Sequence, residues 1–238
     1  MTTFVLVHGG GHGGWCWKWT AAALRADAHV VYTPTLTGFG ERAHLAPFAT
    51  FFQTFVDDVA QVIRFEALED VVLVGHSMGG AIVPRVAEAM PEHIARVVWL
   101  TAAVCNDGET MLEAIPQSPW IAAAVTLEPD GTARTDPDLI LDAAIHDGTP
   151  EQRDFVRQRH TPYPPHALVE PGRLGAFLAL GIPTAYVFAS EDRTIEPAIQ
   201  RRMADRLPGA RRAEVAAGHD AMITRPIDVA RALEAVSS

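Results

Sequence analysis

Short apolar runs rich in β-branched residues alternate along this chain with longer segments in which apolar positions recur at helical spacing. The short runs predict strands at FVLVH (4–8), HVVYTP (29–34), VVLVGH (71–76), ARVVWLTA (95–102), IPTAYVFAS (182–190) and ARRAEVAA (210–217). The longer segments predict helices at WKWTAAALRA (17–26), FVDDVAQVIRFEAL (55–68), AIVPRVAEAM (81–90), IEPAIQRRMADRL (195–207) and IDVARALEAV (227–236). Such an alternation is typical of a parallel sheet with helices on both faces.

The alternation stops between about Asn106 and Leu180, where proline, acidic residues and short apolar helices predominate and no convincing strand occurs. Open parallel sheets bind their ligands beyond the carboxyl ends of the strands, and a long insertion there commonly covers the site. The sequence therefore predicts one domain over 1–238, with a core at about 1–105 and 181–238 and a helical cap inserted at about 106–180.

The composition limits the partners that this domain can have. A chain of 238 residues that is 48% hydrophobic can bury one substantial core. Its net charge of −10 and pI near 5.4 argue against binding to nucleic acid or to anionic membranes. A small neutral or apolar molecule is the expected partner. The two cysteines, Cys16 and Cys105, make no disulfide framework and have no metal-ligand spacing, so neither a metal nor a cofactor is expected.

The location of the protein is predicted from two features of the sequence. The first residues, MTTFVLVHGG, contain no basic leader, and their apolar run ends at His8. No apolar stretch approaches the roughly 18 residues of a membrane span. A cytoplasmic protein is therefore expected. Whether it forms a homodimer is left open.

The segment VVLVGHSMGG places Ser77 between an apolar run and a helical pattern, with Gly75 and Gly79 on either side. This G-x-S-x-G spacing is typical of a sharp strand-to-helix turn that exposes a serine hydroxyl. A serine becomes a nucleophile only with an imidazole to take its proton and a carboxylate to orient that imidazole. The sequence should therefore supply both partners at other strand ends.

Asp192 follows one predicted strand in AYVFASEDRTIEP, and His219 follows the next in AEVAAGHDAMI. The order Ser, Asp, His is the chain order of a triad in a sheet of this kind. Two other carboxylates stay open as the acid: Glu191 is adjacent to Asp192, and Asp107 follows an earlier strand. Ser77, Asp192 and His219 are the predicted catalytic residues.

Attack on an ester carbonyl creates an oxyanion, which needs backbone donors held in place. The first predicted strand ends in HGGGHGGWCW (8–17), where small residues allow close approach. The amides of Gly10 and Met78 are the expected donors. His8 and His12 are interpreted as braces of this loop, since buried polar groups are usually hydrogen-bonded.

Residues of the cap are the candidates for the substrate pocket. The segment RQRHTPYPPHAL (157–168) contains His160 and Tyr163, and SPWIAAAV (118–125) contains Trp120, a large apolar ring in a region that should cover the site. Gly9, directly after the first strand, completes the predicted pocket set.

Four segments resemble one group of the α/β-hydrolase superfamily: FVLVHGGGHGGWCW (4–17), TLTGFGER (35–42), the spacing from DDVAQVI (57–63) to VVLVGHSMGG (71–80), and GHDAMITRP (218–226). The group contains plant methylesterases, salicylate-binding esterases, hydroxynitrile lyases and many bacterial esterases. The resemblance covers most of the core and fades across the cap. It implies an α/β-hydrolase fold with the triad and the oxyanion donors given above.

Two positions separate lyases from esterases within that group. Hydroxynitrile lyases that resemble it carry a threonine after the first-strand histidine and a lysine after the catalytic one, whereas this sequence has Gly9 and Asp220 there. A carboxylate repels cyanide where a lysine attracts it. The nucleophile position likewise holds Ser77 instead of the aspartate of similar dehalogenases and epoxide hydrolases.

The sequence thus predicts a serine hydrolase for a small, largely apolar carboxylic ester, with a methyl ester or a lactone as candidates. Two alternatives stay open. One is a lyase-like or other non-hydrolytic reaction on the same triad, and the other is a receptor for a small ligand with residual hydrolysis.

Overall fold

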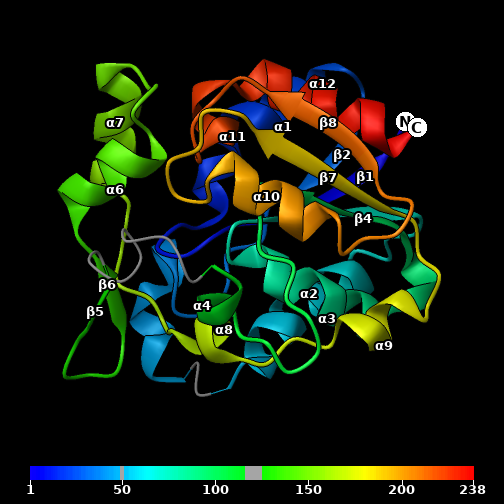
Figure 1. Ribbon diagram of the computed structural model, residues 1–238, viewed down its shortest axis with the longest axis horizontal. Coiled ribbons are helices and arrows are strands. Elements are labelled where there is room, and N and C mark those ends of the chain that lie inside the picture. The colour runs from blue at the N-terminus through cyan, green and yellow to red at the C-terminus, as the bar shows by residue number, and fades with distance from the viewer. Residues whose placement is uncertain (49–50, 116–124) are drawn as a thin grey trace.

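A six-stranded sheet forms the centre of the computed structural model, which describes residues 1–48, 51–115 and 125–238 (Figure 1). The strand order is β2-β1-β3-β4-β7-β8, and every neighbouring pair is parallel. The bounds are β1 (Thr3–Val7), β2 (Val30–Tyr32), β3 (Val71–His76), β4 (Ile94–Leu100), β7 (Thr184–Ala189) and β8 (Arg211–Val215). Each strand predicted from the apolar runs is therefore confirmed, and the sheet is parallel as expected.

Helices cover both faces of this sheet (Figure 1). One face carries α1 (Lys18–Ala26), α11 (Ala221–Thr224) and α12 (Pro226–Ser237); the other carries α2 (Gln53–Phe65), α3 (Gly79–Ala89) and α10 (Pro197–Ala204). Short 3-10 helices η1 (Gly14–Trp17), η2 (Gly40–Phe48) and η3 (Pro91–His93) lie in the connections. Successive side chains of β1 alternate between the two layers, because Phe4 packs in the core of the first face and Val5 in that of the second.

The chain between β4 and β7 supplies the cap. Its described elements are α4 (Met111–Ala114), β5 (Val125–Leu127), β6 (Ala133–Thr135), α6 (Pro137–Ala144), α7 (Pro150–Arg157), α8 (His166–Val169) and α9 (Leu174–Leu178). In Figure 1, β5, β6, α6 and α7 stand in a column beside the sheet. The last helix of the cap, α9, packs on α3, and its Phe177 ring lies 5.7 Å from that of Trp99 on β4.

The expectation that the cap contains no strand is wrong, because β5 and β6 pair as an antiparallel hairpin. The two strands are joined by EPDGT, in which Gly131 has a φ of 83° and the Asp130 carboxylate accepts hydrogen bonds from Thr132. Each strand has only three residues, too few for an alternating pattern to stand out. The Asp-Gly pair was the available signal, since it is typical of hairpin turns.

The parallel arrangement brings the predicted site residues to one edge of the sheet. His8 follows β1, Ser77 follows β3, Asp192 follows β7 and His219 follows β8. Because all these strands run in one direction, their carboxyl ends share that edge. Within the described ranges, no helix combines the length and the apolar character that a bilayer crossing requires.

Candidate active site

Ser77 lies in a strained turn between β3 and α3. Its φ of 51° is in the left-handed region that a residue with a side chain rarely adopts. Glycine is needed around it: a Cβ on Gly75 would lie 2.7 Å from the Gly79 oxygen, and one on Gly80 would lie 2.4 Å from the Ala103 oxygen. The glycines therefore allow the close packing that holds the serine at the bend.

Asp192 is almost completely buried, with 3% of its surface exposed, and its carboxylate is surrounded by donors. The amides of Thr194 and Ile195 donate to Oδ1 at 2.6 and 2.9 Å. At Oδ2 the donors are the Thr101 hydroxyl and the Gln200 amide, the latter at 3.2 Å. Hydrogen bonds from several sides fix the direction of this carboxylate.

His219 completes a hydrogen-bonded pair with this carboxylate. Its Nδ1 lies 2.7 Å from Asp192 Oδ2, and its ring is buried. A carboxylate there keeps the proton on Nδ1, which leaves Nε2 free to accept one. His219 and Ser77 line the same cavity, so the structure places a base and a hydroxyl at one site.

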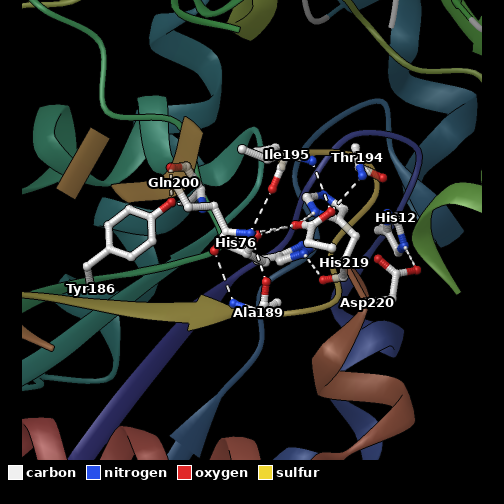
Figure 2. Close-up of polar contacts among 12 residues, drawn as sticks. His12, His76, Tyr186, Ala189, Thr194, Ile195, Gln200, His219 and Asp220 are labelled. Atoms are coloured by element: carbon white, nitrogen blue, oxygen red, sulfur yellow. Dashed lines mark hydrogen bonds and ion pairs between the residues drawn. The ribbon is translucent and has the colours of Figure 1, made fainter. Parts of the chain in front are cut away.

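His76, the residue before the serine, holds the turn that carries His219. Its Nε2 donates to the His219 carbonyl at 3.0 Å, and the two rings lie 4.8 Å apart (Figure 2). Burial, together with the neighbouring His219, holds the pKa of His76 well below its usual range. A neutral His76 thus ties the serine turn to the histidine turn without adding a charge between them.

The other two carboxylates that the sequence left open as the acid lie elsewhere. Asp107 is exposed and accepts a hydrogen bond from the Gly175 amide at 2.9 Å. Glu191 is also exposed. Among these three carboxylates, Asp192 is the one that contacts His219.

The loop after β1 places Gly10 at the cavity, opposite Met78 from the serine turn. The Gly9 carbonyl accepts a hydrogen bond from His8 Nδ1 at 2.8 Å, while His8 Nε2 accepts one from the Leu36 amide at 3.1 Å. Since a peptide group is planar, this hydrogen bond also fixes the direction of the Gly10 N–H. Burial lowers the pKa of His8 to about 3, so His8 is a neutral brace.

A cavity of about 520 Å³, counting its mouth, opens in front of Ser77. Most of its wall is apolar, and its lining residues are Gly10, His12, Ser77, Met78, Met111, Val125, Thr135, Ile140, Tyr163, Leu168, Thr194, Ile195 and His219. Strand β5 and helices α4, α6 and α8 of the cap contribute to this wall. The cavity suits a small apolar ligand with one polar group directed at the serine.

The predicted pocket residues have different places. Tyr163 lines the cavity, and its ring lies 3.1 Å from where a Cβ of Gly10 would be. Gly9 lies behind the serine, since its Cβ would meet Ser77 Cβ at 2.9 Å. His160 is not among the cavity-lining residues and packs over Gly11 beside the loop. Trp120 lies outside the described residues.

Sequence reasoning missed two residues, Gln200 and Thr101, that donate hydrogen bonds to the Asp192 carboxylate. Gln200 on α10 bonds the backbone of Ala189 and Ile195 as well as the carboxylate. Its signal was its position on the buried face of a helical pattern, three residues before Met203. Thr101, at the end of β4, offered no comparable signal.

In the parts of the chain that the structure describes, no three His, Cys, Asp or Glu side chains form a cluster able to hold a metal ion. The arrangement is instead that of a nucleophile, a base with its carboxylate, and backbone donors, which suits acyl transfer.

Comparison with known proteins agrees with this chemistry. Residues 4–232 match the model of the Alpha/beta hydrolase family. A carbendazim hydrolyzing esterase of Nocardioides sp. is 33% identical over 241 residues, covering 99% of this chain and 100% of the relative. A putative chloroplastic methylesterase of Arabidopsis thaliana is 36% identical over 107 residues, 44% of this chain but only 31% of the relative.

A solved structure covers the whole chain. An extracellular alpha/beta-hydrolase from a Paenibacillus species superimposes with a TM-score of 0.85 at 25% identity, covering 99% of each chain. That protein is described as sharing structural and functional homology with tobacco salicylic acid binding protein 2.

Proposed function

The chain belongs to the alpha/beta hydrolase family, and from that premise we propose that it hydrolyses a small, largely apolar carboxylic ester through an acyl-enzyme on Ser77. The family membership confirms the resemblance to esterases of this fold. The chain is a carboxylesterase of the alpha/beta hydrolase type, the class to which its esterase relatives point. The triad and the substrate are the finer parts of the proposal.

One arrangement supports this reaction above all: Ser77 at a strained turn shares a cavity with His219, whose Nδ1 is held by Asp192 at 2.7 Å. His219 takes the hydroxyl proton as Ser77 attacks the ester carbonyl, and Asp192 stabilises the imidazolium that forms. The amides of Gly10 and Met78 stabilise the oxyanion.

The same residues then release the alcohol and hydrolyse the acyl-enzyme. The imidazolium of His219 gives its proton to the leaving alcohol, so that the acyl group stays on Ser77. Water then adds to the acyl carbonyl while His219 takes one of its protons; the bond between the acyl carbon and Ser77 Oγ breaks as His219 returns that proton to Oγ, and the acid is released. No cofactor takes part in any of these steps.

The apolar cavity wall supports a small substrate without formal charge, and a methyl ester or a lactone is proposed as its form. No nucleic-acid or membrane partner is part of this proposal. A cytoplasmic location and the choice between monomer and homodimer stay predictions.

A panel of esters tests the proposed substrate class. Turnover of p-nitrophenyl esters is expected to fall by about tenfold or more as the acyl chain outgrows the cavity. Methyl esters, lactones and carbendazim are compared in the same assay. Equal turnover of acetyl and long-chain esters would contradict a small, closed acyl site, and no turnover of any of them would contradict hydrolysis.

The lyase alternative leads to a separate prediction. A threonine in place of Gly9 would bring its Cβ to within 2.9 Å of Ser77 Cβ. The position after His219 holds Asp220, a carboxylate paired with His12, instead of a lysine ammonium that could bind departing cyanide. Mandelonitrile and acetone cyanohydrin are therefore expected to release cyanide at the uncatalysed rate between about pH 5 and 6. The pH is kept low because cyanohydrins decompose as hydroxide rises. Release faster than that of Ser77→Ala, with every ester untouched, would establish the lyase instead.

A further inference from the structure

His12 and Asp220 form a buried ion pair that the proposed mechanism does not use. His12 lies in the loop after β1 and Asp220 directly follows His219, so the two residues are 208 positions apart in the chain. His12 Nε2 lies 3.0 Å from Asp220 Oδ2 (Figure 2). His12 is 2% exposed and Asp220 is fully buried.

The two partners of His12 determine its protonation state. Its Nδ1 lies 2.7 Å from the Gly10 carbonyl oxygen, and its Nε2 faces the Asp220 carboxylate. A carbonyl oxygen and an ionised carboxylate accept hydrogen bonds and cannot donate them. Both nitrogens of His12 must therefore carry hydrogen, which makes the ring an imidazolium.

The Gly10 carbonyl that His12 holds belongs to the residue whose amide is the proposed oxyanion donor. His8 already holds the peptide group before Gly10 through the Gly9 carbonyl, at 2.8 Å. His12 holds the peptide group after it. Both peptide planes that meet at Gly10 are thus fixed, one by a neutral histidine and one by a charged histidine.

We propose that His12 is a positioning residue that Asp220 keeps protonated, and that its imidazolium fixes the Gly10 amide for the oxyanion and adds a positive charge to the cavity wall. This inference rests on the proposed ester hydrolysis. A hydrogen bond from a charged donor is shorter and stronger than one from a neutral donor. Because His12 also lines the cavity, its charge acts in a desolvated space where it is weakly screened.

The charges around His12 agree with this assignment. Burial alone would lower the pKa of His12, but the charge and hydrogen bond of Asp220 more than offset it, so the pKa is raised. Burial alone would raise the pKa of Asp220, but His12 lowers it to about 2. The pair is therefore charged at neutral pH.

Four other titratable groups near the pair, three histidines and one cysteine, favour their neutral forms. The rings of His76 and His160 lie 6.1 and 5.5 Å from that of His12, and burial lowers the pKa of both. His8 is neutral for the same reason, and burial raises the pKa of the Cys16 thiol. His219 precedes Asp220, and the turn that carries both residues also packs against His146 and Asp147, near which Arg225 lies.

The burial of Asp220 has an energetic cost that is not explained by a purely structural role of the pair. Its Oδ1 is buried and has no hydrogen-bond partner among the described residues. A buried ion pair is often no more stabilising than apolar side chains of similar volume. Its presence beside the cavity is accounted for by the charge that it maintains on His12.

The protonation state can be measured without reference to activity. In the wild-type protein labelled with nitrogen-15 histidine, both nitrogens of His12 are expected to show imidazolium shifts at pH 7.5. In Asp220→Asn the carboxamide can still donate to Nε2, so His12 should become neutral at that pH while Nδ1–H still holds Gly10. A neutral His12 in the wild type, including a pair with the proton on Asp220, would overturn the proposal.

The kcat and KM of three variants distinguish a positioning role of His12 from a purely structural one. His12→Phe removes both donors and is expected to lower kcat by about 100-fold with KM nearly unchanged, because the oxyanion forms only in the transition state. His12→Asn keeps a donor near the place of Nδ1 and should recover about tenfold of that loss. Asp220→Asn should lower kcat by about tenfold at pH 7.5 and introduce a decline with rising pH at or below the ordinary histidine range, because burial alone lowers the pKa of His12.

A matched control uses a partly exposed histidine–carboxylate pair, His29 with Glu234 at 3.0 Å, on the α12 side of the fold. Glu234→Gln should leave kcat and its pH profile unchanged.

Unchanged kcat in Asp220→Asn, or a lower melting temperature with unchanged kcat in His12→Phe, would overturn the positioning role. If His12→Phe does not fold, the kinetics of Asp220→Asn and the nitrogen-15 spectra test the proposal in its place. Inactivity of the wild type on all esters would instead contradict the proposed function and leave the spectral result standing.

Discussion

Ser77→Ala is expected to lower kcat by about 10⁴-fold or more and to abolish labelling by a fluorophosphonate. The reason is that the acyl-enzyme of the proposed mechanism forms on the Ser77 hydroxyl, which lies at the turn where φ is 51° and shares the cavity with His219. The residual rate acceleration in Ser77→Ala should come from substrate binding and the oxyanion donors alone. Turnover is measured with the best ester of the panel, and labelling is located by mass spectrometry.

A control serine shows that the effect belongs to the site. The Ser237 hydroxyl donates to the Leu233 carbonyl on α12, outside the cavity-lining set. Ser237→Ala should keep wild-type turnover and wild-type labelling. Turnover in Ser77→Ala that equals the wild type would show that another group is the nucleophile.

Asp192→Asn is expected to lower kcat by about 10³ to 10⁴-fold while the fold is preserved. The carboxamide can direct its N–H₂ at His219 Nδ1, which moves the imidazole proton to Nε2. Nε2 then cannot accept the proton of Ser77. The remaining amide oxygen can still accept hydrogen bonds from the Thr194 and Ile195 amides, so the loop after β7 should stay in place.

Asp107→Asn is the matched control, because Asp107 is the exposed carboxylate that follows β4, where it accepts a hydrogen bond from the Gly175 amide. It should keep turnover within about twofold of the wild type, as surface substitutions commonly do. Circular dichroism and thermal melting establish that both variants are folded. If Asp107→Asn caused the larger loss, the acid would belong to the strand before the cap.

The sheet could be predicted from the sequence because its strands are buried on both faces. Such strands appear as continuous apolar runs, and VVLV (71–74) is fully buried, as its composition indicated. The cap could not be predicted equally well. Its hairpin has strands of three residues, and a pattern this short is decided by packing against the core.

The candidate site, like the fold, was predictable from the sequence only in part. The order of Ser77, Asp192 and His219 after successive strands was enough to expect that they meet, since parallel strands end at one edge. The residues that orient them come from elsewhere: Thr101 ends β4 and Gln200 lies on α10, yet both contact one oxygen of Asp192. Nothing local marks such contacts, because they depend on how a helix packs on the sheet.

By itself the sequence determined the fold class and the esterase type and predicted the candidate reacting groups, because apolar periodicity, turn glycines and motif spacing are local properties of the chain. Only the tertiary structure decided which apolar side chains line the cavity at Ser77 and which groups each buried histidine contacts. His12 and Asp220 show why: each was noted on its own, as a loop brace and as a residue beside the catalytic histidine. Their pairing across 208 positions, and the burial that gives it electrostatic strength, exist only in the folded chain.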